Sequence, residues 1–390
     1  FLLQGQVNDY IGHPAAVIVV VFLGANLAQS IVNSVLRGQH LVHVSGVFTP
    51  IRTGSRSIVQ IVGLLSGLGL TALYIGYTFG YLLVAVLGLF VVIKNIKELT
   101  LPDREHYRKI ISYAKFSWVG SLRTRAFNWV DVTILGFFVS SSVIGIYTAA
   151  WNIAVFLILF GGSLSETLFP EMSSLSADDD PEAVADLFET ALAFGGLILI
   201  PGLIGGTLLG EQLLQIYGDE FSQGSTILSV LIIATLIQGY QRQFTTTLNA
   251  LDKPDIAFRI NAIFIVANVV LNVSLIPYFG VLGAAAATAT AVAISLIAAN
   301  YTLSSLIDYS IPVREIARQW GSAAIMGAII ELARRFEVMY VDFAYEFVTV
   351  GILVTLGAGV YFISLFTLST RFKKTVMDNI PSKLSQFNTE

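Results

Sequence analysis

Residues 257–305 read "AFRINAIFIVANVVLNVSLIPYFGVLGAAAATATAVAISLIAANYTLSS". The stretch holds two apolar runs, 257–277 and 281–305, and each is long enough to form a helix across the hydrocarbon core of a bilayer, which is about 30 Å thick. Only the residues 278–280 separate the two runs. We therefore expect two consecutive transmembrane helices here, and not a segment of a soluble core.

The same pattern recurs along the whole chain. Of its 390 residues, 55% are hydrophobic and only 12% are charged, and the mean hydropathy is +0.75. A soluble domain of this length usually has about twice that charged fraction. The sequence predicts an all-α polytopic membrane protein with eleven spans: 14–36, 56–73, 76–93, 113–138, 142–169, 188–209, 224–247, 257–277, 281–305, 319–335 and 347–369. The first residue is Phe1, and we expect that the N-terminus of a longer protein is missing.

Composition also narrows the function. The chain has no cysteine, which excludes thiolate catalysis and iron–sulfur sites. Its four histidines, His13, His40, His43 and His106, are scattered, so we predict no metal site and no cofactor. A net charge of −4 gives no indication of nucleic-acid binding.

Lysine and arginine are distributed asymmetrically between the loops. With their flanking helix ends, the loops on one side hold 18 of the 22 basic residues. These loops are 37–55, 94–112, 170–187, 241–256, 306–318 and the tail after 369. The opposite side has only Arg334 and Arg335, near the end of a span. The positive-inside rule therefore predicts that the first set of loops and the C-terminus are cytoplasmic.

The span 113–138 contains charged residues, in "YAKFSWVGSLRTRAFNWVDVTILGFF". On a helix, at 100° per residue, six of its polar side chains fall within an arc of roughly 120°. They are Ser117, Ser121, Thr124, Arg125, Asn128 and Asp131. Because lipid does not accommodate such a stripe, we expect it to face a water-filled cavity or other polar helices. Arg123 lies off the arc, where it can snorkel or pair with another helix.

The arginines indicate an anionic substrate, because guanidinium stays charged and matches phosphate oxygens in a bidentate manner. We predict substrate binding by Arg123, Thr124, Arg125, Asn128 and Asp131, with Asp131 also a candidate for coupling to a cation or proton. The alternative is a structural ion pair in which Arg125 and Asp131 neutralise each other or a neighbour.

Polar residues in five other positions of the spans extend this prediction. We predict substrate binding by Asn152, Gln238, Asn268 and Asn272, and a second ion-coupling candidate in Glu166. Asn268 and Asn272 share a helix face, and their alternative role is an interhelical hydrogen bond. Glu166 lies near the end of its span, and its alternative role is that of an interfacial side chain. Within 188–209, Pro201 should kink the helix.

Several motifs occur in an order typical of a known family. "WVDVTILGFFVSSSVIGIYTAAWNIA" (129–154) is followed by "LFPEMSSL" (168–175), and residues 248–289 carry Asn268, Asn272, Pro277, Gly280, Gly283 and Ala284. This series resembles the polysaccharide transporter branch of the multidrug/oligosaccharidyl-lipid/polysaccharide (MOP) flippase superfamily. The resemblance covers some 260 residues.

The resemblance implies a MATE-like bundle with two helical lobes. Eleven spans fit a fourteen-helix member that lacks its first three helices. The domains implied are the remainder of the N-lobe (1–93), a cytoplasmic lobe linker (94–112), a six-helix C-lobe (113–305), and two extra helices with the tail (306–390).

The implied function is transport without catalysis. The chain is expected to flip a polyprenyl-linked glycan from the cytoplasmic to the outer face of a prokaryotic cell membrane, by alternating access, coupled to a monovalent cation or proton. An alternative is a cation-coupled multidrug exporter, which predicts a cavity without arginines. A membrane glycan polymerase would need a large outer loop, and the longest outer loop expected here, 209–224, is short.

Overall fold

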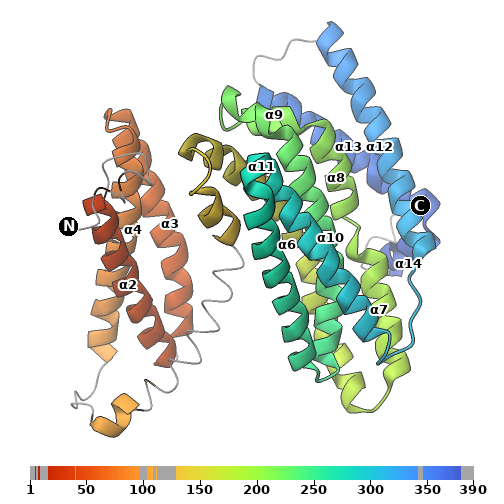
Figure 1. The fold of residues 1–390 in the computed structure, drawn as a ribbon, viewed down its shortest axis with the longest axis horizontal. Helices are drawn as coiled ribbons and strands as arrows, with labels where there is room; N and C mark the ends of the chain where they lie inside the picture. The colour runs from red at the N-terminus through yellow and green to blue at the C-terminus, as the bar shows by residue number, and fades with distance from the viewer. Residues whose placement is uncertain are drawn as a thin grey trace, which may run out of the picture. The chain divides into compact units, whose positions relative to one another are not determined.

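The computed structural model of the chain describes residues 5, 8, 16–39, 41–95, 103–108, 111, 129–340 and 346–378. Every regular element within these ranges is a helix (Figure 1). The chain divides into two compact units, Phe1–Leu122 (unit 1) and Arg123–Glu390 (unit 2). The predicted division of the chain into an N-lobe remainder, a linker, a C-lobe and two extra helices stays a prediction.

Unit 1 is built from three long helices, α2 (Ala16–Gly38), α3 (Val42–Leu65) and α4 (Leu70–Asn95). Helix α4 packs against both of the others, and glycines on its surface let the backbones approach closely. A Cβ added to Gly88 would overlap with Val32 Cγ1 of α2, and one added to Gly80 would lie 2.8 Å from the carbonyl oxygen of Arg52 in α3.

The boundaries of α3 correct the predicted span map. The predicted loop 37–55 is wrong over most of its length, because α3 already begins at Val42, and the predicted spans 56–73 and 76–93 are divided at the wrong place. The turn between α3 and α4 lies at 66–69, where Gly67 (φ 81°) and Gly69 (φ 52°) adopt positive φ. Glycine takes this conformation without the steric cost that a Cβ imposes.

Unit 2 is a helical bundle in which α10 (Ser225–Ala250) packs against α6 (Ser141–Ala177), α8 (Leu199–Leu208) and α11 (Pro254–Leu303) (Figure 1). Its other elements are α7 (Pro181–Gly195), α9 (Gly210–Gln215), the 3₁₀ helix η1 (Asp219–Gly224), α12 (Val313–Tyr340), α13 (Glu346–Leu368) and α14 (Thr370–Asp378).

Helix α11 is a hairpin of two helices. Gly280, with φ 55° and ψ −134°, interrupts the helical conformation. The side chains of Asn268 and Thr288 are 3.1 Å apart, whereas twenty residues of straight helix would separate them by about 30 Å. The chain therefore folds back at Gly280, and the predicted division between 257–277 and 281–305 is confirmed.

The predicted span 188–209 is also interrupted. Helix α7 ends at Gly195 and α8 begins at Leu199, so the break lies just before Pro201. A proline ring clashes with the carbonyl group four residues earlier, here that of Leu197, and it also removes a hydrogen-bond donor. Helix α8 can restart with Pro201 in its first turn, where the missing N–H is tolerated.

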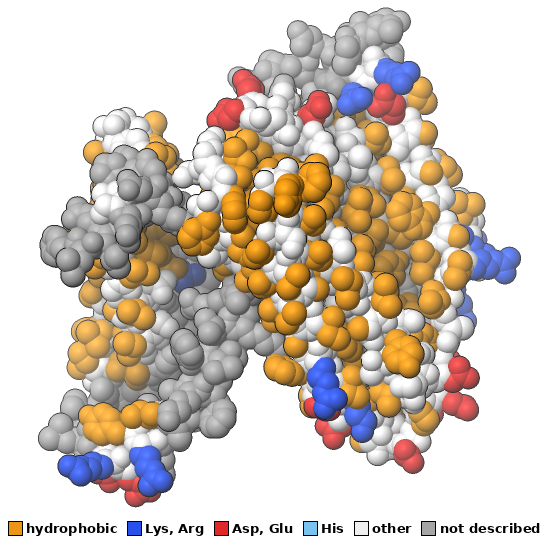
Figure 2. All heavy atoms as spheres, in the orientation of Figure 1, with side chains coloured by type: hydrophobic (Ala, Val, Ile, Leu, Met, Phe, Trp, Pro, Cys, Tyr) orange, Lys and Arg blue, Asp and Glu red, His pale blue; other side chains and the backbone are white. Residues whose placement is uncertain are grey.

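The surface of the bundle is apolar. Within the described residues, seven helical segments are long and apolar enough to cross a membrane: Val17–Leu36, Leu70–Asn95, Ser141–Ile158, Pro181–Leu208, Asp219–Ala250, Pro254–Leu303 and Phe347–Leu368. On the face drawn in Figure 2, hydrophobic side chains cover the middle of unit 2, and charged side chains gather at its ends and along one edge. The chain is a multi-pass membrane protein, and the total of eleven spans stays a prediction.

Candidate functional site

Asp131 is the centre of a polar cluster between three helices of unit 2. It lies in the helical segment 129–135 and is half-buried. Its Oδ2 atom accepts hydrogen bonds from the hydroxyl of Tyr147 in α6 (2.9 Å) and from that of Thr288 in α11 (2.7 Å). Its Oδ1 atom accepts a third from Asn272 Nδ2, at 2.7 Å.

Two asparagines on the first arm of α11 extend the cluster. Asn272 Nδ2 also lies 2.9 Å from the carbonyl oxygen of Asn268 and 3.1 Å from Asn268 Oδ1. Asn268 Nδ2 donates to Thr288 Oγ1 at 3.1 Å, on the second arm. The three partners of the carboxylate group, and Asn268 behind them, are at most 5% exposed. We call these residues the Asp131 cluster: Asp131, Tyr147, Asn268, Asn272 and Thr288.

Within the described residues, the negative charge of Asp131 is not compensated by a positive charge. The three hydrogen-bond donors to Asp131 are neutral, and within the described part of the chain no basic side chain forms an ion pair with it. Asn272 Oδ1 is buried and has no hydrogen-bond partner. Burying a carboxylate without a countercharge, or an oxygen without a donor, is unfavourable. One cation bound between the Asp131 carboxylate and Asn272 Oδ1 would neutralise the carboxylate and give the amide oxygen a partner.

The structure brings together three of the predicted site residues, Asp131, Asn268 and Asn272. Asn152 is exposed on α6 and Gln238 is half-buried on α10, and neither belongs to the cluster. Four of the predicted residues lie outside the described part of the chain: Arg123, Thr124, Arg125 and Asn128. The side chain of Glu166 lies outside it as well. The cavity predicted along the stripe on 113–138 stays a prediction.

Sequence reasoning did not assign a functional role to Tyr147 or Thr288. Thr288 lies in the alanine-rich stretch 283–291, which predicts close helix packing and gives little sign of a site. The contact between Thr288 and Asn268 depends on the hairpin turn at Gly280. Sequence spacing alone therefore does not place Thr288 in the cluster.

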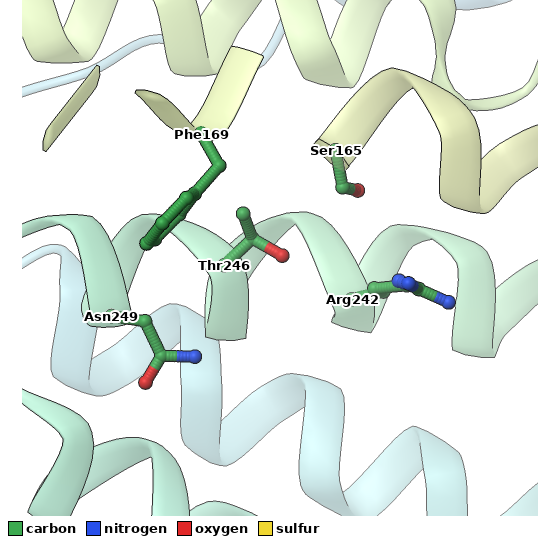
Figure 3. A pocket seen from close by; sticks show the side chains of 5 residues that line it. All are labelled: Ser165, Phe169, Arg242, Thr246 and Asn249. Carbon is green, nitrogen blue, oxygen red and sulfur yellow. The ribbon is translucent and has the colours of Figure 1, made fainter. Parts of the chain in front are cut away.

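A second polar site in unit 2 is a pocket of about 210 Å³ between α6 and α10 (Figure 3). Arg242, Thr246 and Asn249 follow one another on a single face of α10, at positions i, i+4 and i+7. Ser165 and Phe169 of α6 line the opposite side. This pocket presents a guanidinium, a hydroxyl and an amide, which together can bind an oxyanion or polar hydroxyl groups.

The wall of this pocket is fixed by a buried contact. Ser165 is 2% exposed, and its hydroxyl donates to Oε1 of Gln243 in α10, at 2.9 Å. Gln241, two positions before Gln243, is also buried, and its Nε2 donates to Ser295 Oγ of α11 at 3.3 Å. Helix α10 is therefore held on both sides by side-chain hydrogen bonds, and Arg242 projects from a constrained helix.

Comparison with known proteins identifies the family. The family model described as "Lipid II flippase MurJ" matches residues 16–349. The chain belongs to the MurJ lipid II flippase family. It is 32% identical over 381 residues to a "Probable flippase AglR" of Haloferax volcanii, covering 97% of this chain and 78% of that protein. It is 27% identical to the "Probable low-salt glycan biosynthesis flippase Agl15" of the same organism, covering 84% of this chain and 69% of that protein.

Solved structures show the same fold. A "Lipid II flippase MurJ, inward closed conformation" superimposes with a TM-score of 0.69 at 19% identity, covering 91% of this chain and 74% of that one. An inward-facing MATE multidrug transporter of the MOP superfamily superimposes with a TM-score of 0.60 at 12% identity, covering 78% and 77%. These matches confirm the expected MATE-like fold.

Proposed function

We propose that this chain moves a lipid-linked glycan of the polyprenyl-phosphate type from the cytoplasmic to the outer face of a prokaryotic cell membrane. The observation that carries this proposal is the 32% identity to a probable archaeal flippase over 97% of the chain, within a match to the lipid II flippase family over residues 16–349. The glycan headgroup crosses by alternating access, in which the protein opens first to one side of the membrane and then to the other. In this proposal the C-terminus is cytoplasmic.

In this function the Asp131 cluster binds the coupling ion. Carboxylate, amide and hydroxyl oxygens are the donors that hard cations prefer, and the unpartnered Oδ1 of Asn272 supplies a free oxygen close to the carboxylate. A single carboxylate balances a single charge, which favours a monovalent cation or a proton over a divalent ion. When bound, the cation supplies the missing positive charge, while Asp131, Asn272 and Thr288 hold it in place.

The pocket between α6 and α10 that Arg242 lines contributes to binding of the glycan headgroup. A guanidinium donates paired hydrogen bonds to phosphate or carboxylate oxygens, and Thr246 and Asn249 lie beside it on the same face of α10. The stripe on 113–138, with Arg125, is proposed to contribute in the same way. Glu166 remains a second proposed coupling residue.

The test is complementation of a host strain that lacks its own lipid-linked glycan flippase. The wild-type chain is expected to restore the surface glycan. Asp131→Asn, which keeps the shape of the side chain and removes its charge, is expected to abolish restoration at an unchanged protein level in the membrane. Asp219→Asn is the matched control, because Asp219 is exposed in η1.

Two results would contradict the proposal. One is a wild-type chain that reaches the membrane and restores no glycan in any such host. The other is a wild-type chain that confers drug efflux without glycan export, which would establish the multidrug exporter instead.

A further inference from the structure

Two arginines lie halfway along α3 in unit 1. Arg52 and Arg56 are about 15 and 21 Å from the start of the helix, which is about 36 Å long and begins at Val42. Its neighbours α2 and α4 are both apolar enough to cross a membrane, and only short connections, 39–41 and 66–69, join them to α3. Helix α3 must therefore cross between them, with both arginines too far from its ends to snorkel to a surface.

Each guanidinium lies over an aromatic ring of α4. Arg52 Cζ is 5.0 Å from the ring centroid of Tyr81, and Arg56 Cζ is 4.6 Å from that of Tyr77. Phe22 of α2 contacts both tyrosines edge-on, with centroids 5.4 and 6.0 Å away. The two arginines are spaced i, i+4 on α3 and the two tyrosines are spaced i, i+4 on α4, so the two stacked pairs lie one helical turn apart.

Glycines bring the two helices close enough for this stacking. A Cβ added to Gly76 would lie 2.9 Å from the carbonyl oxygen of Arg56, and one added to Gly80 would lie 2.8 Å from that of Arg52. Each glycine precedes the stacked tyrosine by one residue. The backbone contact between α3 and α4 therefore sets the orientation of the guanidiniums. Because these side chains are already ordered, a ligand that binds them loses little free energy to side-chain ordering.

The positive charge of this group is not balanced within its own three helices. No aspartate or glutamate occurs between Asp9 and Glu98 in the sequence. Among the described residues neither arginine forms an ion pair, and Arg56 Nε is buried without a hydrogen-bond partner. Cation–π contacts are attractive, but they do not neutralise two like charges one helical turn apart.

We infer that Arg52 and Arg56 form an anion-binding site in unit 1, which receives an oxyanion of the transported molecule. The inference rests on the proposed function, since it assigns a second set of headgroup contacts to the flippase. Two guanidiniums one turn apart present several N–H donors to a group with two or more charged oxygens. That group is either the phosphate linkage to the lipid or the carboxylate of an acidic sugar.

The experiment measures binding of farnesyl diphosphate to the purified full chain in detergent micelles by isothermal titration calorimetry. The double variant Arg52→Gln/Arg56→Gln is expected to bind about tenfold or more weakly, since it loses charge-assisted hydrogen bonds. The control is Arg259→Gln/Arg314→Gln, which removes the same charge from exposed positions of unit 2 and is expected to bind within about twofold of wild type.

A second variant, Arg52→Lys/Arg56→Lys, covers the case in which the glutamine variant does not fold. It keeps both charges and loses the planar fork of donors, so we expect affinity between those of the wild type and of the glutamine variant. Thermal melting verifies that each variant is folded. Competition identifies the source of the oxyanion: displacement by inorganic pyrophosphate assigns the phosphate linkage, and displacement by glucuronate alone assigns an acidic sugar.

The inference is overturned if a folded glutamine variant, or the lysine variant where glutamine prevents folding, binds farnesyl diphosphate as tightly as wild type. The arginines would then serve only to pack α3 against α4. It is also overturned if the wild-type chain binds none of the three probes while it still restores surface glycan in the complementation assay. That result would leave the proposed function intact, so the two failures are distinguishable.

Discussion

The side chains of Asp131 and Asn272 meet at 2.7 Å, although 141 positions separate them in the chain. The same carboxylate is bonded to Tyr147, 16 positions away, and to Thr288, 157 positions away. One ionisable group thus joins the segment 129–135 to α6 and to both arms of α11. Because the contacts come from distant parts of the chain, the cluster exists only in the folded protein, and ligands that bind there must stabilise the fold.

Sodium is expected to raise the melting temperature of the purified chain when it replaces choline at constant ionic strength. A ligand present at 100 times its Kd stabilises the folded state by about 2.7 kcal/mol. Asp131→Asn should abolish the difference between the two salts, whereas Asp219→Asn should preserve it. Equal melting of the wild type in both salts, with a shift only on changing pH, would assign the site to a proton.

Thr288→Val is expected to destabilise the chain and to weaken the sodium effect. The substitution keeps the shape of the side chain but removes a hydroxyl that donates to Asp131 at 2.7 Å. A hydrogen bond to a charged group contributes about 1.5–3 kcal/mol. Thr290→Val is the control, because Thr290 is exposed on the same arm of α11. Indistinguishable unfolding of the two variants would mean that the bond is not formed in the membrane protein.

Gly280→Ala is expected to destabilise unit 2. At φ 55° and ψ −134° the residue lies in a region that alanine enters only with strain, at a cost of about 1–3 kcal/mol. Gly359→Ala, in the helical interior of α13 with open space around its Cβ, should be neutral or slightly stabilising. Thermal unfolding followed by circular dichroism measures both, and equal melting temperatures would argue against the turn at Gly280.

Gly80→Ala is expected to lower both the stability of unit 1 and its affinity for farnesyl diphosphate. Its Cβ would meet the backbone oxygen of Arg52 at 2.8 Å, so α4 must move away from α3 and carry Tyr81 with it. Gly54→Ala on α3 has nothing within 4 Å of the new atom and is the control. Unchanged affinity in a folded Gly80→Ala variant would show that the stacking of Arg52 on Tyr81 does not position the site.

Much of the Asp131 cluster could be predicted from sequence. Asp131 is conspicuous as an acid within an apolar stretch, and Asn268 and Asn272 share a helix face by their spacing. Their mutual contact could not be predicted from periodicity, because it depends on how the segment 129–135 packs against α11. A role for Thr288 could not be predicted either, since its neighbours are alanines that indicate packing alone.

Arg52 and Arg56 illustrate a limit of charge counting. The positive-inside rule treats arginine as a marker of loops, so the predicted span began at position 56 and both residues were assigned to the cytoplasmic side. In the structure they lie in the middle of a helix, held by tyrosines of α4. A functional arginine inside a span and an arginine at its end look alike in sequence, and only the helix boundaries distinguish them.

The fold of α11 at Gly280 has a mechanical consequence. Asn268 and Asn272 precede that glycine and Thr288 follows it, so the carboxylate of Asp131 ties the two arms of the hairpin together on one side of their shared vertex. Protonation of the acid would remove the negative charge that strengthens its bonds to both arms, and would let the angle between the arms widen. A change of charge at one carboxylate would in this way move the far ends of the two arms of α11.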